Sequence, residues 1–294
     1  PGQGSQALKM MDNLAEFAIV QQTFAEASAA SGVDFWAMLQ EETTEKINQT
    51  INTQPLLLTA SYATYLVWLE QSGGKVPDYM AGHSLGEYSA LAASGVLDFV
   101  DAVKLVRKRA EFMQEAVKPG EGGMAAVLGL SDELVIAGCD EVMASGLGVV
   151  QGVNFNSVGQ VVIAGNKAAV EKASEVLKAK GARKVMSLPV SVPSHCDLMK
   201  PAAEKLALEL NNVRFNPAKV PLIQNVNGEI ATDIHAIKDG LVKQLYSPVL
   251  WTKSVATLAQ NDVMTIVECG PGKVLSGLNK RIHESAKLFN LNSA

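Results

Sequence analysis

The segment Gly82-His83-Ser84-Leu85-Gly86 constrains the fold more than any other part of the chain. Its G-x-S-x-G pattern describes a sharp turn that leads from a strand into a helix and exposes the central serine. The flanks fit, because residues 76–81 predict a short strand and residues 87–94 a helix rich in alanine and leucine. Glycine is needed where a side chain would clash as the backbone doubles back. We predict that Ser84 is a nucleophile; the alternative is an ordinary glycine-rich turn between a strand and a helix.

The composition indicates a folded protein without a membrane span or a metal site. Of the 294 residues, 48% are hydrophobic and 19% are charged, which is typical of a globular chain. A net charge of −5 gives no whole-molecule attraction to nucleic acid or to an anionic membrane. Cys139, Cys196 and Cys269 form no C-x-x-C pair, which fits a reducing cytosol and argues against zinc. With no apolar run of bilayer length and no secretory segment, we expect a cytoplasmic protein.

The hydrophobic pattern changes between residues 118 and 190, which we predict to form a subdomain. Strands and helices alternate there in the order βαββαβ, at residues 124–130, 132–144, 149–155, 160–164, 167–180 and 184–190. This is the order of a ferredoxin-like unit. We therefore predict an α/β protein whose core, residues 1–117 and 191–294, carries this unit as an insertion.

The two core segments outside this insertion are predicted to be mainly helical. Three exceptions are expected: a strand at residues 76–81, a hairpin at residues 220–232 that turns at Asn227-Gly228, and a strand at residues 264–268. The last strand ends in a Gly270-Pro271-Gly272 turn.

The helix predicted over residues 98–117 carries an arginine inside its apolar face. Arg109 projects from within the apolar stripe, whereas most other charged side chains lie opposite; the stripe is formed by Phe99, Val103, Val106, Ala110 and Met113. A guanidinium stays protonated, so on a buried face it needs an anionic partner. Arg109 could form a structural ion pair, or extend past the core edge into water. It could also bind a substrate carboxylate through two hydrogen bonds.

His195 is the leading candidate for the base that activates Ser84. It follows the strand at residues 184–190 in a loop that precedes a helix at residues 202–210. Among the other histidines, His83 lies inside the turn itself, and His235 and His283 are predicted to lie on exposed helices. The alternative is a plain loop histidine. No acid that would complete a triad is evident from the sequence.

Several stretches of the chain together resemble the malonyl-CoA:acyl-carrier-protein transacylases. They occur in order over essentially the whole chain: Pro1-Gly2-Gln3-Gly4-Ser5-Gln6, Thr53-Gln54-Pro55, the segment from Gly82 to Ala90, Pro193-Ser194-His195 and Gly270-Pro271-Gly272-Lys273. The resemblance is greatest to the stand-alone bacterial enzymes of type II fatty-acid synthesis. It implies an α/β-hydrolase-like core with an inserted ferredoxin-like subdomain. Family members also have an apolar strand before Pro-Gly-Gln-Gly, and we expect the complete protein to have one.

The resemblance implies a role for each matching residue. Ser84 would be the nucleophile and His195 its general base, while Arg109 would bind the malonyl carboxylate. The backbone N–H groups of Gln3 and Leu85 would form the oxyanion hole. The side chains of Gln54 and His83 would line the substrate pocket. Gln244 would orient His195 through its main-chain carbonyl in place of an acid. A carbonyl in the last turn of a helix has no intrahelical partner and carries the negative end of the helix dipole.

The implied activity is transfer of a malonyl group from malonyl-CoA to the phosphopantetheine thiol of acyl carrier protein, without a cofactor or a metal. Because such carriers are acidic, we expect a basic docking patch. The candidates form two groups. The first contains Lys180, Arg183 and Lys184, and the second contains Lys280 and Arg281. Solvated lysines at helix ends are an equally good interpretation of each group.

Other functions remain open at this stage. The enzymatic alternatives are a serine thioesterase or esterase and an acyltransferase that serves polyketide synthesis. A catalytically silent carrier-binding protein is a more distant one. We expect a monomer that binds neither nucleic acid nor membranes.

Overall fold

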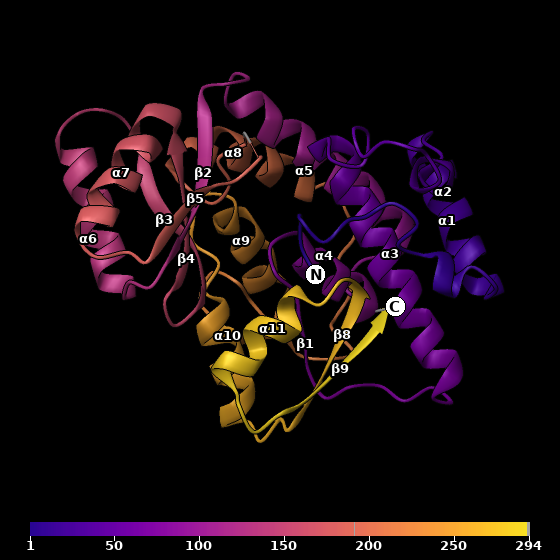
Figure 1. Cartoon of the computed structure of the whole chain (residues 1–294). Coiled ribbons are helices and arrows are strands. Elements are labelled where there is room, and N and C mark those ends of the chain that lie inside the picture. The colour runs from indigo at the N-terminus through magenta and orange to yellow at the C-terminus, as the bar shows by residue number, and fades with distance from the viewer. Residues whose placement is uncertain (191, 293–294) are drawn as a thin grey trace.

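The computed structural model describes residues 1–190 and 192–292 and has the α/β architecture that the sequence predicts (Figure 1). Residue 191 and residues 293–294, which begin and end the second predicted core segment, lie outside the described residues. The N-terminal part is helical, as expected, with η1 (Asp12–Leu14), α1 (Ala18–Ser31), α2 (Phe35–Leu39), α3 (Thr50–Gln71), α4 (Leu85–Ala93) and α5 (Phe99–Ala116). A second helical group comprises η2 (Asp197–Met199), α8 (Lys200–Leu210), α9 (Ile234–Gln244), α10 (Trp251–Gln260) and α11 (Val274–Ile282).

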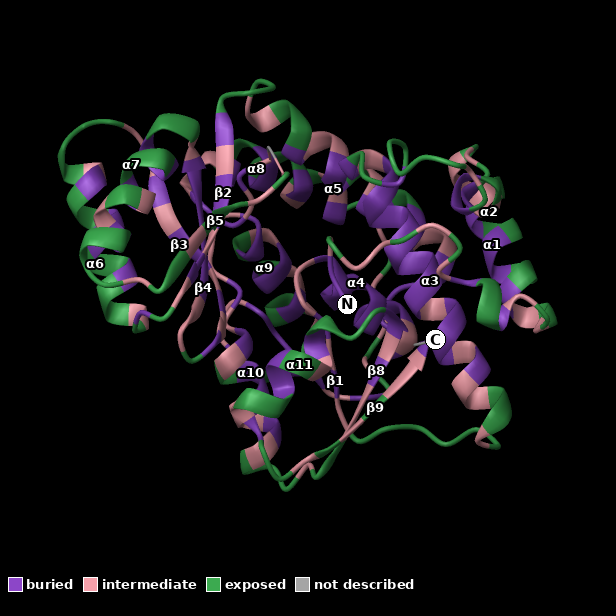
Figure 2. Cartoon of the chain, in the orientation of Figure 1, coloured by how far each residue is buried: buried purple, intermediate pink, exposed green. Residues whose placement is uncertain are grey.

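Helix α3 runs through the main hydrophobic core. Its consecutive residues Leu56, Leu57 and Leu58 are all fully buried, so the helix is packed on every side at this point. Figure 2 shows the buried residues concentrated on α3 and α4, while the outer surfaces of α6 and α7 are exposed. Helix α5 begins after Asp98, whose carboxylate accepts hydrogen bonds from the N–H groups of Val100 and Asp101. The elements that carry the candidate site are therefore anchored in the core.

Two small sheets lie in the described part of the core. In the first, β1 (Met80–Ala81) pairs in parallel with β6 (Leu222–Ile223), which pairs antiparallel with β7 (Ile230–Ala231). In the second, β8 (Thr265–Pro271) and β9 (Lys287–Asn292) run in parallel. The predicted hairpin is confirmed, with Gly228 at its turn at φ 66°. A cavity of about 410 Å³ lies between β1 and β8, with Pro1 among its lining residues.

The strand predicted at residues 76–81 is mostly wrong. Only its last two residues pair with β6, and Val76 is 56% exposed. Pro77 has no N–H group to donate to a neighbouring strand, and no core covers this stretch. The apolar run therefore becomes regular strand only where it enters the interior at Met80.

Residues 122–187 form the predicted ferredoxin-like unit. Its helices are α6 (Asp132–Ala144) and α7 (Lys167–Ala179), and its strands are β2 (Gly122–Leu128), β3 (Val150–Ser157), β4 (Gln160–Asn166) and β5 (Lys184–Ser187). The strands form an antiparallel sheet in the order β3-β4-β2-β5. Helices α6 and α7 cover its outer face (Figure 1). The last strand was predicted to reach residue 190 but ends at Ser187, because Leu188 and Val190 pack into a cluster with Met124 and Cys196 on the inner face.

The unit is joined to the core by backbone hydrogen bonds. Val249 N–H donates to the Val153 carbonyl at 2.8 Å, and Phe155 N–H donates to the Val249 carbonyl at 3.0 Å. Val249 lies between α9 and α10, so β3 is held directly against the part of the core that carries Gln244. Within residues 1–190 and 192–292, no helix has both the length and the hydropathy of a bilayer span.

Candidate active site

Ser84 lies at a sharp turn between β1 and α4, as the motif predicts. Its backbone adopts φ 54° and ψ −111°, a conformation that costs a residue other than glycine about 1–3 kcal/mol. The turn is so tight that a Cβ atom at Gly82 would lie 1.8 Å from the Gly86 carbonyl oxygen. Only glycine fits there, which is why the chain can reverse and leave the Ser84 side chain facing His195.

His195 lies within hydrogen-bond distance of Ser84. Its Nε2 is 2.7 Å from Ser84 Oγ, and the residue is only 3% exposed. Its Nδ1 lies 2.6 Å from the Gln244 main-chain carbonyl, which can only accept a hydrogen bond. The proton is therefore on Nδ1, and the Nε2 lone pair faces the Ser84 hydroxyl. His195 itself has φ 65°, and its N–H donates to the Leu245 carbonyl, so its loop is held at the end of α9.

Gln244 connects His195 to the buried Arg109. It is the last residue of α9 and is fully buried, so its carbonyl has no partner within the helix. Its side-chain Oε1 accepts a 2.9 Å hydrogen bond from Arg109, and its Nε2 donates to the Ser84 carbonyl at 3.0 Å. One glutamine thus orients the imidazole with its backbone and the guanidinium with its side chain.

Arg109 is a buried cation next to Ser84. It is 1% exposed, which excludes extension into water. Its Nη1 donates to Gln54 Oε1 at 2.8 Å, and its Nη2 lies 3.4 Å from Ser84 Oγ. No carboxylate of the described residues lies within ion-pair distance of it, and its Nε–H has no hydrogen-bond partner there. A structural ion pair is therefore excluded within this part of the chain. Two of the five guanidinium N–H groups, one on Nε and one on Nη1, are not used by the hydrogen bonds in this part of the structure.

The N-terminal segment lies directly against the turn. A Cβ atom at Gly2 would lie 2.6 Å from the His83 carbonyl oxygen, so glycine permits this close approach. Leu85 is the first residue of α4, and its N–H has no helical acceptor. Neither this N–H nor that of Gln3 donates to another group in residues 1–190 or 192–292. One unused backbone donor thus follows Ser84 directly, and a second comes one residue after the contact between Gly2 and His83. An oxyanion hole requires two such donors.

The remaining histidines have different surroundings. His83 Nε2–H donates to Asn156 Oδ1 of β3 at 2.8 Å, so the inserted unit contacts the turn directly. His235 is exposed on α9, as predicted. The prediction for His283 is wrong: the residue is only 9% exposed and its Nε2 lies 2.7 Å from the Val263 carbonyl. Its ring bonds to a backbone carbonyl 20 residues earlier in the chain, which the polar sequence around it does not indicate.

Burial keeps His195 neutral. Desolvation, followed by the charge of Arg109, lowers its pKa to about 3, and desolvation lowers the pKa of His83 to about 4. A base acts above its pKa, so we expect the acylation rate of Ser84 to keep its value from pH 8 down to pH 5. An unshifted imidazole would lose about 30-fold at pH 5. The acylation rate across this pH range is measured by stopped flow with malonyl-CoA, the thioester that the resemblance implies. A rate that falls with a midpoint near pH 6.5 would contradict the lowered pKa of His195.

Two site residues were missed at the sequence level. Asn225, which follows β6, and Glu87, on the first turn of α4, are both buried next to Ser84. Desolvation raises the pKa of Glu87 to about 7, against the opposing effects of a hydrogen bond from Asn225 N–H and the charge of Arg109. The only sequence signal was their composition: a carboxylate and an amide inside apolar stretches.

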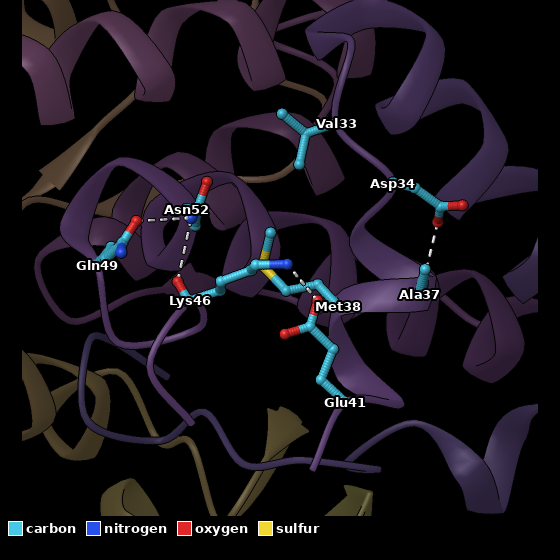
Figure 3. Close-up of a pocket in the computed structure, with 8 residues that line it drawn as sticks. All are labelled: Val33, Asp34, Ala37, Met38, Glu41, Lys46, Gln49 and Asn52. Carbon is cyan, nitrogen blue, oxygen red and sulfur yellow. Dashed lines mark hydrogen bonds and ion pairs between the residues drawn. The ribbon is translucent and has the colours of Figure 1, made fainter. Parts of the chain in front are cut away.

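A cavity elsewhere in the structure does not hold the candidate site residues. A cavity of about 520 Å³ lies between α2 and the start of α3 (Figure 3). Its polar groups bond to each other, with Lys46 paired to Glu41 and Asn52 donating to Gln49, and none of the predicted site residues lines it. Across residues 1–190 and 192–292, no group of three or more His, Cys, Asp or Glu side chains could hold a metal ion.

The predicted basic groups lie on separate elements. Lys180, Arg183 and Lys184 are exposed at the end of α7 and the start of β5, and Lys180 pairs with Glu141 of α6 at 3.3 Å. Lys280 and Arg281 are exposed on the last turn of α11.

Comparison with known proteins identifies the family. The model of the acyl transferase domain family matches residues 1–288. A malonyl CoA-acyl carrier protein transacylase of Escherichia coli K12 is 56% identical over 293 residues, covering 99% of this chain and 94% of that protein. The chain belongs to the malonyl-CoA:acyl-carrier-protein transacylases. The Bacillus subtilis transacylase is 46% identical over 288 residues, covering 98% and 90% of the two chains.

Solved structures of transacylases have the same fold. An acyl carrier protein S-malonyltransferase from Vibrio cholerae matches with a TM-score of 0.96 and 51% identity, covering all of this chain and 95% of that one. A malonyl-transacylase solved in complex with its type II polyketide acyl-carrier protein matches with a TM-score of 0.97 and 50% identity, covering 100% and 94%. The predicted family and fold class are confirmed.

Proposed function

We propose that this chain transfers a malonyl group from malonyl-CoA to the phosphopantetheine thiol of acyl carrier protein, in fatty-acid synthesis. The observation that carries the proposal is the arrangement of three side chains: a serine, a neutral imidazole 2.7 Å from it and a buried guanidinium without an ion-pair partner in the described residues. The high identity to named transacylases supports the same activity.

The first half-reaction acylates Ser84. His195 Nε2 accepts the hydroxyl proton as Oγ attacks the thioester carbonyl carbon. The N–H groups of Gln3 and Leu85 stabilise the resulting oxyanion, and one such donor typically contributes about 10²–10³ in rate. As the carbon–sulfur bond breaks, His195 returns the proton to the sulfur and coenzyme A leaves as the thiol.

The second half-reaction deacylates the enzyme. The carrier thiol gives its proton to His195 while its sulfur attacks the ester carbonyl, and Ser84 regains the proton as the carbon–oxygen bond breaks. During both steps the Gln244 carbonyl stabilises the imidazolium through Nδ1–H. Arg109, oriented by Gln54 and Gln244, would hold the malonyl carboxylate. His83 would line the substrate pocket.

The buried arginine favours malonyl transfer over simple ester hydrolysis. An esterase needs the serine, the base and the oxyanion donors but has no need of a buried cation beside them. Residues 118–190, which we propose to act as a subdomain, would close the site from the side where Asn156 bonds to His83. No step requires a cofactor, and we propose that the protein acts as a cytoplasmic monomer.

Intact-protein mass spectrometry after mixing with malonyl-CoA tests this function. We expect a malonyl adduct on Ser84 that persists in buffer and disappears when holo acyl carrier protein is added. Rapid loss of the adduct without a carrier would indicate a thioesterase. No adduct would contradict the proposal.

The basic groups offer a test of carrier binding. Because rim charges guide an acidic partner, we expect Lys180→Glu combined with Arg183→Glu to raise the KM for acyl carrier protein about 3- to 10-fold. The rate of Ser84 acylation should not change. Lys172→Glu, within α7 and outside both groups, is the control. An unchanged KM in the double variant would rule out this surface.

A further inference from the structure

The side chain of Asn225 bonds to the backbone on both sides of the nucleophile turn. Asn225 is fully buried two residues after β6 ends. Its Nδ2 donates to the Gly82 carbonyl at 2.7 Å, and its Oδ1 accepts from Ser84 N–H at 2.7 Å. Oδ1 also accepts from Gln244 Nε2 at 3.2 Å. These three hydrogen bonds of the amide are all directed at the turn or at a residue that contacts it.

These bonds extend the core sheet past the end of its strands. β1 and β6 pair over only two residues each, and the chain then leaves the sheet toward Ser84. In a parallel pair, one residue bonds to the carbonyl before its neighbour and to the N–H after it. The Asn225 amide makes this pair of bonds opposite His83, to Gly82 and Ser84. A side chain thus takes the place of the strand that the turn lacks.

Asn225 is itself held from the helix that begins at the nucleophile. Its backbone N–H donates to Glu87 Oε1 at 2.7 Å, and its carbonyl accepts from Leu250 N–H at 3.0 Å. Glu87 is 3% exposed and lies on the first turn of α4. The strand side and the helix side of the turn are therefore tied to the same asparagine.

We propose that Asn225 is a positioning residue that holds Ser84 in its strained conformation, with Oγ toward His195 and Leu85 N–H free for the oxyanion, and that Glu87 fixes Asn225. This rests on Ser84 being the nucleophile of the proposed function. A residue with φ 54° keeps that conformation only where its surroundings impose it. The amide bonds to both neighbours of His83 impose it here.

The test measures the reactivity of Ser84 directly. A fluorophosphonate probe reacts with an activated serine and needs neither the malonyl site nor a carrier. We expect Asn225→Ala to lower the second-order labelling rate about 10²-fold, since misplacement of a reacting group by about 1 Å has an effect of this size. The rate is measured on protein that thermal denaturation shows to be folded.

Two further variants separate positioning from stability. Gln224→Ala is the matched control: it removes a buried side-chain amide from the adjacent position, where it bonds to the Ala236 carbonyl, so it should lower Tm but leave labelling within about two-fold. Asn225→Asp keeps the acceptor for Ser84 N–H and loses the donor to Gly82, so its rate should lie between those of wild type and Asn225→Ala.

The outcomes distinguish this inference from the proposed function. If folded Asn225→Ala is labelled at the wild-type rate, the inference is wrong. If that variant does not fold, Asn225→Asp decides in the same way. A wild-type protein that is not labelled at Ser84 would instead contradict the proposed nucleophile.

Discussion

Replacing Ser84 by alanine is expected to abolish the malonyl adduct and to lower kcat for malonyl transfer by about 10⁴- to 10⁶-fold. Loss of the nucleophile in a serine enzyme leaves only the contribution of the oxyanion donors and of substrate binding. The neutral His195 and the buried Arg109 would remain in place, because each makes only one hydrogen bond to Ser84 Oγ. Intact-protein mass spectrometry and a carrier-malonylation assay measure the two effects.

Helix α4 provides a matched control for this substitution. Ser89 lies one turn further along, is 9% exposed, and its Oγ has no hydrogen-bond partner in the described residues. Ser89→Ala should therefore retain both the adduct and the transfer rate. A malonyl adduct that survives in Ser84→Ala would show that another residue is acylated.

Replacing Arg109 by alanine is expected to remove the preference for malonyl-CoA over acetyl-CoA. A charge-assisted hydrogen bond contributes about 1.5–3 kcal/mol, and each 1.4 kcal/mol or so is tenfold, so two such bonds to a carboxylate predict a loss of about 10²-fold or more in kcat/KM. Acetyl-CoA has no carboxylate, so its kcat/KM should change much less. Steady-state kinetics with both thioesters give the ratio.

Helix α5, which carries Arg109, also contains a control for this substitution. Arg107 lies on the partly exposed side of α5, 3.9 Å from Glu111, so Arg107→Ala should leave the preference intact. Arg109→Ala also removes the donors that bond to Gln54 and Gln244, and a lower Tm is expected for that reason. An unchanged malonyl-to-acetyl ratio in folded Arg109→Ala would refute the carboxylate assignment.

Local patterns predicted the fold well where the signal is periodic or is fixed by a turn. The βαββαβ order, the turn at Gly228 and the place of Arg109 on the apolar face of α5 all follow from side chains close together in the sequence. The strand at residues 76–81 was largely wrong, because an apolar run becomes strand only where a partner and a covering layer exist. His283 was wrong for a related reason: burial depends on what packs over a residue, not on its own neighbours in sequence.

The amino-acid sequence by itself determined the sharp turn at Ser84, the arginine on an apolar face and a histidine loop between two regular elements. Glycine sterics and helical periodicity act over a few residues, so these features can be read locally. Only the tertiary structure decided that Gln244 would serve both the imidazole and the guanidinium, and that Asn225 would bond to Ser84 from 141 residues away. Those contacts depend on how distant elements pack against each other, and buried polar groups take their partners from whatever that packing brings within reach.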